Sequence, residues 1–171
     1  MWYFRSLHAH VARELVRMRS GGGDVLDAGC GTGGLILRLR EANPAWRFAG
    51  IDFMPLACEL ARRRCGEGTD IREASITALP YADASFDAVV LITTLGEIPD
   101  RESAIHEIAR VVRPGGRLVV GELFGDPHFT TPGDVERLGR ASGLLLEQRS
   151  GPWVGFFARL SKPTGDDGPA G

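Results

Sequence analysis

Apolar residues along the 171-residue chain fall into short runs that alternate with segments of helical periodicity. The runs Asp24–Ala28 and Phe86–Ile92 are bounded by glycine, proline or acidic residues, as is typical of strands buried in a parallel sheet. Between such runs, apolar residues recur on one helical face, for example Ile105, Ile108 and Val112. This alternation predicts an α/β fold of three layers, with helices on both faces of the sheet.

Chain-breaking residues separate these elements. The pair at positions 43–44 ends the helix after the first strand, and Pro55 opens the next helix, because proline at the first helical turn needs no N–H partner. Thr131, Pro132 and Asp134 together form the start signal of the last helix. The final two runs are joined by a short turn, so they are expected to be antiparallel. The expected strands span residues 24–28, 46–52, 70–74, 86–92, 117–122, 144–149 and 154–160.

A glycine-rich loop at residues 29–34 connects the first expected strand to its helix. Gly29, Gly31 and Gly33 permit positive φ and close backbone approach, because glycine has no Cβ. The helix that follows directs its free N–H groups and the positive end of its dipole toward whatever lies over the loop. Asp52, at the end of the second strand, is placed to accept both hydroxyl groups of a ribose. A nucleotide-like ligand is therefore expected here.

Two classes of ligand compete for this loop. Its G-x-G-x-x-G spacing matches the dinucleotide fingerprint, with an acidic residue roughly 20 positions further on. The spacing of Asp27, Gly29, Gly31 and Gly33 instead resembles motif I of the class I S-adenosylmethionine-dependent methyltransferases. The Asp27 carboxylate would repel a pyrophosphate, whereas it suits the ammonium and sulfonium groups of S-adenosylmethionine. We therefore favour the methyl donor, and keep a dinucleotide-binding reductase and an empty structural turn as alternatives.

Composition narrows the functional classes further. A chain of 171 residues predicts one domain with a substantial core, and a net charge of −2 gives no electrostatic case for nucleic acid. Cys30, Cys58 and Cys65 lack metal-ligand spacing, so we expect buried thiols in a reducing cytoplasm and no metal site. No apolar run approaches the ~20 residues of a membrane span, so no transmembrane segment is expected.

The resemblance to class I methyltransferases covers most of the chain, about residues 24–162. It implies a Rossmann-like sheet of strand order 3-2-1-4-5-7-6, with strand 7 antiparallel, and S-adenosylmethionine as the cofactor. Segments at residues 95–101 and 126–129, together with Glu122, are similar to the ubiquinone/menaquinone-biosynthesis-like group (methyltransferase type 11), whose small relatives include phospholipid N-methyltransferases. The segments that carry the broader resemblance are VLDAGCGTG at 25–33, GID at 50–52, LP at 79–80, SFD at 85–87 and RVVRPGGRL at 110–118.

Position by position, the resemblance implies a cofactor site. Asp27 and the loop backbone would hold the methionine part, Asp52 the ribose, and the Thr93 backbone the ammonium group. Many relatives place aspartate where this chain has Ser75, and a serine hydroxyl is a weaker, neutral acceptor for the adenine amino group. The complete set of implied cofactor residues is Asp27, Gly29, Cys30, Gly31, Gly33, Asp52, Phe53, Ser75, Ile76 and Thr93.

The methyl acceptor is less well defined by the sequence. His128 and Glu97 are the candidate catalytic bases, with Asp126 beside them, although a solvent-facing histidine and a paired glutamate are the simpler interpretations. We predict methyl transfer to a small-molecule or lipid-like acceptor in the cytoplasm, with a homodimer as a possible assembly. The alternative is a non-catalytic, S-adenosylmethionine-binding accessory module or pseudoenzyme. An N-terminal helix or short lid (1–23) and a disordered tail (163–171) are expected to flank the domain (24–162).

Overall fold

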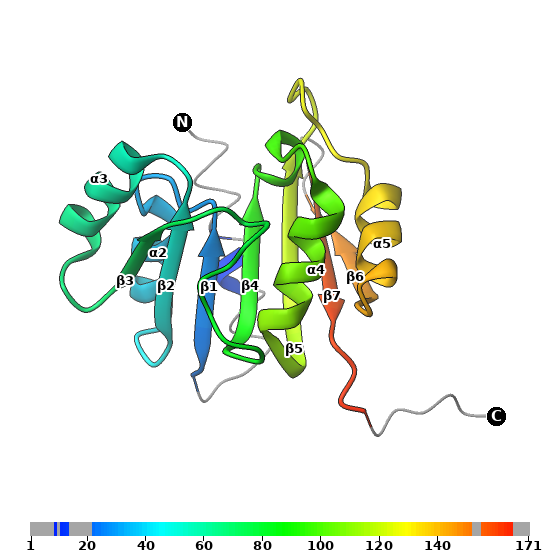
Figure 1. The fold of residues 1–171 in the computed structure, drawn as a ribbon, viewed down its shortest axis with the longest axis horizontal. Helices are drawn as coiled ribbons and strands as arrows, with labels where there is room; N and C mark the ends of the chain where they lie inside the picture. Colours follow the sequence, from blue (N-terminus) through cyan, green and yellow to red (C-terminus); the bar gives the residue numbers. More distant parts are fainter. Residues whose placement is uncertain (1–8, 10, 14–21, 152–154, 166–171) are drawn as a thin grey trace.

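The computed structural model describes residues 9, 11–13, 22–151 and 155–165 of the chain. The strands form one seven-stranded sheet in the order β3-β2-β1-β4-β5-β7-β6, in which β7 runs antiparallel to both neighbours (Figure 1). The predicted fold class and strand order are therefore confirmed. The strands are β1 (Asp24–Ala28), β2 (Arg47–Asp52), β3 (Asp70–Glu73), β4 (Phe86–Ile92), β5 (Val112–Leu123), β6 (Leu145–Ser150) and β7 (Gly155–Ser161).

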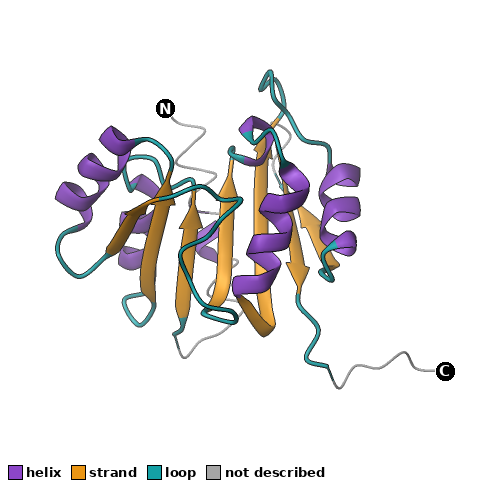
Figure 2. Ribbon diagram, viewed as in Figure 1, coloured by secondary structure: helices purple, strands orange, loops and turns teal. Residues whose placement is uncertain are grey.

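Helices cover both faces of this sheet, which gives the three predicted layers (Figure 2). Side chains of a strand alternate between faces, so the central strands contribute to two separate cores. In β4, Val89 and Leu91 pack in one core with α4 and α5, while Val90 and Ile92 pack in the other with α2 and α3. The helical elements are α2 (Gly34–Ala42), α3 (Pro55–Cys65), η1 (Leu95–Glu97), α4 (Arg101–Val111) and α5 (Pro132–Ala141).

Strand β5 starts earlier than the sequence predicts, at Val112 rather than at residue 117. Val112 pairs with Phe86, and the register with β4 then shifts before regular pairing resumes. Gly115 takes a φ of +76° in this irregular part, and its amide donates to the Lys162 carbonyl over 2.8 Å. The sequence predicts from Pro114, Gly115 and Gly116 that the chain turns before the strand, but the structure accommodates these residues as an irregularity inside one long strand.

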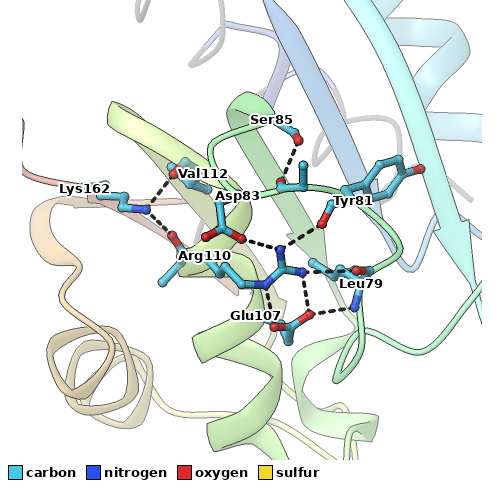
Figure 3. A network of polar contacts seen from close by, with 10 residues as sticks. Leu79, Tyr81, Asp83, Ser85, Glu107, Arg110, Val112 and Lys162 are labelled. Atoms are coloured by element: carbon cyan, nitrogen blue, oxygen red, sulfur yellow. Dashed lines mark hydrogen bonds and ion pairs between the residues drawn. The ribbon is translucent and has the colours of Figure 1, made fainter.

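The connection between β3 and β4 is fastened to α4 by Arg110 (Figure 3). Its guanidinium donates to both carboxylate oxygens of Glu107, at 2.7 and 2.8 Å, and to Asp83 at 2.8 Å. It also donates to the carbonyl oxygens of Tyr81 and Leu79. Because this connection also carries residues 75 and 76, the network stabilises one wall of the site described below.

The ends of the chain are described only in part. Residues 9 and 11–13 are helical, and Val11 is buried in the core on the α2 and α3 side. The remainder of the expected N-terminal helix and most of the expected tail lie outside the described residues. Within the described part of the chain, no helix combines the length and hydropathy needed to cross a membrane. Cys30, Cys58 and Cys65 are free and buried, as predicted.

Candidate functional site

A cavity of about 600 Å³ lies at the carboxyl ends of the parallel strands. Strand β1 pairs with β2 on one side and with β4 on the other. The chain therefore adds strands outward in one direction up to β3 and then returns to the other side of β1 with β4, which makes this point the switch in strand order. Open α/β sheets bind ligands at such switch points. The cavity is lined by residues that follow β1, β2, β3 and β4: Gly29, Gly31, Asp52, Phe53, Ala74, Ser75, Ile76, Ile92, Thr93, Thr94, Glu97, Ile98 and Pro99.

The glycine loop forms one wall of this cavity. Gly29 has a φ of +87°, and a Cβ placed on it would lie 2.5 Å from the Thr94 side chain, so only glycine fits. Gly31 has a φ of +50°, and its Cβ would meet no atom within 4 Å because this position borders the open cavity. Gly33, the residue that precedes α2, also has positive φ. The loop therefore presents backbone alone to a ligand.

The second strand fixes both the loop and the carboxylate of Asp52. The Ile51 carbonyl accepts from the amides of Gly29 and Cys30, at 2.9 and 2.8 Å. Asp52 accepts from the amide of Gly31 through one oxygen and from that of Met54 through the other, both at 2.9 Å. Each carboxylate oxygen keeps further acceptor capacity. Asp52 is thus oriented by two backbone donors and can still accept from two hydroxyl groups of a ligand.

Asp27 precedes the glycine loop and is not among the residues that line the cavity, but its carboxylate is in an unusual environment. Its side chain is 2% exposed, and its Oδ2 atom has no hydrogen-bond partner among the described residues. Burial, with a smaller contribution from the charge of Asp52, raises the pKa of Asp27 to about 7. A buried carboxylate without a partner is unfavourable, and a cation placed beside it would restore the ionised form. The site therefore fits a ligand that carries an ammonium group, as S-adenosylmethionine does.

The structure brings Ser75, Ile76 and Phe53 to the cavity together. The Ser75 and Thr77 hydroxyl groups lie 2.7 Å apart, and the Ser75 oxygen also accepts from the Thr77 amide at 3.2 Å. Ser75 is therefore already engaged locally, which leaves it less capacity for a ligand. Ile76 is buried, whereas Phe53 is 72% exposed at the cavity wall, so its aromatic face is accessible to a ligand. Stacking and apolar contacts are consequently the main interactions that this end of the cavity can offer a ligand.

Thr93 ends β4 in a strained conformation. Its φ is +51°, which is uncommon for a residue other than glycine. Its amide donates to the Gly121 carbonyl at 2.7 Å, and its hydroxyl donates to the Ile92 carbonyl at 2.8 Å. The backbone is thereby turned into the cavity, where Thr93 is a lining residue. The sequence had not indicated Thr94, which lines the cavity beside it and whose side chain faces Gly29.

The two candidate bases differ in position. Glu97 lines the cavity, whereas His128 is not among the lining residues and its side chain is 64% exposed. The His128 amide donates to Asp126 at 2.8 Å, and its Nδ1 atom lies 3.9 Å from the same carboxylate oxygen. The histidine is therefore seated on the surface loop between β5 and α5. A catalytic role for either residue stays a prediction, and Glu97 has the more favourable location.

Glu122, near the end of β5, is a buried acid that our site prediction did not include. Its side chain is 1% exposed, and burial, followed by the charge of Asp126, raises its pKa to about 7. The nearby Gly96 amide and the charge of Arg101 oppose this rise in the pKa of Glu122 without outweighing it. The sequence signal was available, because a single acid directly follows the run of apolar residues and glycine at 118–121.

Three comparisons bear on this site. The sequence profile of the family described as "Methyltransferase domain" matches residues 26–120. Demethylmenaquinone methyltransferase from Thermus thermophilus is 43% identical over 106 residues, which cover 60% of this chain and 48% of that protein. O-methyltransferase resE from Aspergillus sclerotiorum is 34% identical over 123 residues, covering 69% and 46%. The chain thus spans about half the length of these curated relatives.

A solved structure supports the fold independently of close sequence similarity. The S-adenosylmethionine-dependent methyltransferase from Methanosarcina mazei superposes with a TM-score of 0.75 at 21% identity, covering 87% of this chain and 96% of that one. Fold and cavity together define the class I, Rossmann-like methyltransferase architecture. The chain belongs to the methyltransferase domain family, in its ubiquinone/menaquinone-like group, whose cofactor is S-adenosylmethionine. The predicted family and cofactor are confirmed.

Proposed function

We propose that this protein binds S-adenosylmethionine in the cavity and catalyses transfer of its methyl group to a small apolar acceptor of the quinone type. The observation that carries the proposal is the buried carboxylate of Asp27, whose Oδ2 atom has no partner among the described residues and which lies close enough to Asp52 for that charge to raise its pKa. A dinucleotide would bring a pyrophosphate to this loop, where the ionised Asp27 opposes it. The name of the Thermus relative supports a demethylated quinone as the acceptor.

Each wall of the cavity would contact a different part of the donor. Asp27 would pair with the ammonium group, and Asp52 would accept from both ribose hydroxyl groups in a bidentate arrangement. Phe53 and Ile76 would flank the adenine, because they supply the exposed aromatic face and the apolar surface at that end. Ser75 would contribute little charge, so adenine binding would depend mainly on stacking.

The bound donor supplies a methyl group that is already activated by the positive sulfur. The protein therefore has to align the acceptor with that group and exclude water. Thr94, Ile98 and Pro99 would provide the wall against which an apolar ring packs. Glu97, at the same wall, would take the proton that a hydroxyl group or ring carbon of the acceptor releases. Cytoplasmic location and homodimer formation stay predictions.

Turnover is the direct test of this proposal. The full-length chain is incubated anaerobically with S-adenosylmethionine and 2-prenyl-1,4-naphthoquinol, and mass spectrometry follows the methylated product and S-adenosylhomocysteine. We expect both products in equal amounts. The Asp27→Asn variant should lose turnover, whereas Glu59→Gln, which alters an exposed carboxylate on α3 outside the cavity lining, should retain it.

Two results of this assay would contradict all or part of the proposal. Binding of S-adenosylhomocysteine without methyl transfer to the naphthoquinol or to a panel of phenols and amines would identify a donor-binding module without activity. Turnover with a phenol or an amine alone would retain methyl transfer and replace the quinone as the acceptor class.

A further inference from the structure

The loop between β5 and α5 carries an exposed aromatic side chain at the carboxyl edge of the sheet. This loop extends beyond the carboxyl ends of the parallel strands (Figure 1). Phe124, directly after β5, is 53% exposed, whereas the other phenylalanine of the loop, Phe129, is half-buried. Because an aromatic ring gains free energy when it is removed from water, this position favours an apolar partner.

The loop holds the Phe124 ring in a defined place. The ring packs against Phe129 with the centroids 5.3 Å apart, and Phe129 meets Phe156 of β7 edge to face at 5.8 Å. The amides of Asp126 and Phe129 donate to the carbonyl oxygens of Leu123 and Asp126, at 3.3 and 3.1 Å, which folds the loop into two consecutive turns. One side of the Phe124 ring is therefore supported by the protein, and the rest of it is accessible.

This loop rests directly on the wall of the cavity that follows β4. A Cβ placed on Gly96 would lie 1.7 Å from the carbonyl oxygen of His128, so the two backbones touch without room for a side chain. Ile98, two residues after Gly96, lines the cavity, and Phe129 directly follows His128. Ile98 and Phe129 pack against the same hydrophobic core. Apolar side chains therefore lie on both sides of this backbone contact, with Ile98 in the cavity and the Phe124–Phe129 pair outside it.

The size of the cavity indicates what the exposed ring contacts. A volume of about 600 Å³ accommodates one drug-sized ligand, so the methyl donor and the reacting ring of the acceptor take up most of it. An acceptor with a long apolar chain on its ring must extend that chain outside the cavity. Phe53 borders the cavity at the end proposed for the adenine, whereas the Phe124–Phe129 pair lies beyond the wall proposed for the acceptor ring.

A protein partner would need a larger surface than this loop offers. Interfaces between protein chains bury roughly 800 Å² on each partner. Phe124 is the one exposed large hydrophobic side chain described in the loop, and the polar side chain of His128, 64% exposed, belongs to the same loop. A narrow apolar contact of this kind fits a hydrocarbon chain better than a second protein.

We propose that Phe124, supported by Phe129, binds the apolar chain of the methyl acceptor outside the cavity that holds the reacting ring. The inference rests on the proposed function, because it assumes a prenylated ring of the quinone type beside Ile98 and Pro99. The contact adds affinity by removing part of the chain from water, and it does not touch the reacting atoms. The length of the chain should therefore alter the binding and the KM of the acceptor and leave kcat nearly unchanged.

Binding of oxidised acceptor analogues tests this site without methyl transfer. The full-length chain, saturated with S-adenosylhomocysteine, is titrated calorimetrically with 2-methyl-1,4-naphthoquinone and with 2-geranyl-1,4-naphthoquinone. We expect the wild type to bind the geranyl compound at least about 10-fold more tightly than the methyl compound. Phe124→Ser should reduce this preference about 5-fold and leave the affinity for the methyl compound unchanged. Equal affinities of the two quinones for the wild type, or an unaltered preference in Phe124→Ser, would overturn the proposal.

Two further variants show whether apolar surface at this position is responsible. Phe124→Leu keeps an apolar side chain and should retain most of the preference for the geranyl compound. Leu145→Ser is the matched control, because Leu145 is 52% exposed but begins β6 and does not line the cavity. It should bind both quinones as the wild type does, and loss of the preference in this control would show that the chain binds elsewhere.

Other occupants of the exposed ring give different results. A dimer that light scattering detects in the wild type and not in Phe124→Ser would assign the ring to a second copy of the chain. Binding to phosphatidylcholine vesicles that is lost in the same variant would assign it to a bilayer. Either result would overturn the proposal.

Failure of this inference and failure of the proposed function are distinguishable. Calorimetric binding of S-adenosylhomocysteine alone reports on the donor, and Phe124 is not among the residues that line the cavity. Methyl transfer to 2-geranyl-1,4-naphthoquinol with the same KM in the wild type and in Phe124→Ser would overturn the inference and leave the proposed function intact. Absence of S-adenosylhomocysteine binding in the wild type would refute the proposed function, whichever quinone binds more tightly.

Discussion

The two walls of the cavity are built in different ways. The wall that follows β1 and β2 is made by backbone: the amides of Gly29 and Cys30 bind one carbonyl, and the amide of Gly31 orients Asp52. The wall that follows β4, which we propose for the acceptor and call the acceptor wall, depends on loop side chains such as Thr94 and Glu97. Backbone geometry suits a ligand that never varies, so we propose the first of these walls for the methyl donor and call it the donor wall. Loop side chains can change without disturbing the sheet, which suits an acceptor that differs among relatives.

Charge divides the walls in the same way. Asp27 and Asp52 lie on opposite sides of the glycine loop in sequence and are close enough for Asp52 to raise the pKa of Asp27. Near the acceptor wall, burial and the charges of Asp126 and Glu97 raise the pKa of Glu122, whereas the charge of Arg101 lowers it. The donor wall carries the carboxylate of Asp52, and no basic side chain is among the residues that line the cavity, so we expect this wall to favour a cationic ligand. Beside the acceptor wall, in contrast, Arg101 offsets part of the acidic charge.

The largest effect is expected from filling the donor wall. Gly31→Val would place a branched side chain in open cavity space at a φ of +50°. We expect the left-handed conformation to cost about 1–2 kcal/mol of stability, so the variant folds. Binding of S-adenosylhomocysteine should weaken by more than about 100-fold, because ligand and side chain would occupy the same volume. Calorimetry and thermal melts measure the two effects separately.

Gly34→Ala is the matched control, since its Cβ meets nothing within 4 Å and its φ is not positive. It should retain both stability and binding. Normal binding in a folded Gly31→Val variant would remove the glycine loop from the donor wall.

The second-largest loss of donor affinity is expected from removing the carboxylate of Asp52. Asp52→Ala deletes a charged acceptor for two hydroxyl groups, which we expect to weaken donor binding by about 1.5–3 kcal/mol, or roughly 10- to 150-fold. Glu73→Ala is the control, because Glu73 is exposed, pairs in register with Asp52 and does not line the cavity. Equal dissociation constants for Asp52→Ala and the wild type would show that Asp52 serves the loop alone.

The third prediction concerns the pH dependence of donor binding, which tests whether the charge of Asp27 contributes to the donor wall. The pKa of Asp27 is raised from 3.8 to about 7. The folded protein therefore binds a proton that the unfolded chain releases between about pH 4 and 7, so this group makes stability fall as pH rises through that window. An ammonium ligand selects the ionised form. Below pH 7, affinity for S-adenosylhomocysteine should fall by up to about 10-fold per pH unit, with proton release on binding.

Asp27→Asn should bind weakly at every pH and show no such slope. Affinity of the wild type that stays constant from pH 5.5 to 7.5 would disprove the pairing of Asp27 with the ligand ammonium.

The smallest effect is expected outside both walls. Thr131 caps α5 by accepting from the Asp134 amide at 3.1 Å. Thr131→Ala should lower stability by about 1 kcal/mol, or roughly 2–4 °C in Tm, and leave S-adenosylhomocysteine affinity unchanged. Thr131→Ser restores the hydroxyl and should restore most of the Tm. Altered donor affinity in Thr131→Ala would show that α5 is coupled to the donor wall.

The contrast between the walls also explains what the sequence could predict. The alternation of apolar runs and helical segments was enough for the three layers, since buried parallel strands have a distinctive composition. The spacing of the glycines and Asp52, which follow or end strands that lie side by side, predicted residues that the structure brings to one cavity, whereas their binding of the donor stays a prediction. The start of β5 was misjudged because a proline and two glycines were interpreted as a boundary, whereas a bulge accommodates them within the strand.

The acceptor wall could not be predicted to the same degree. The contact of Gly96 with His128 joins residues far apart in the chain, and no local pattern indicates it. The composition of the loop suggested His128 as a base, yet its imidazole is largely exposed and the backbone of that residue makes the structural contact. Ser75 was singled out as a weak acceptor, but only the structure shows that its hydroxyl is engaged by Thr77.

One measurement tests the central claim most directly, namely that the donor wall accepts a cationic methyl donor rather than a dinucleotide. Calorimetric titrations of the full-length chain with S-adenosylhomocysteine and with NADH, at pH 7.5, compare the two ligand classes at one site. We predict one binding site for S-adenosylhomocysteine, lost in Asp27→Asn, and no heat of binding for NADH. Binding of NADH without binding of S-adenosylhomocysteine would contradict the account.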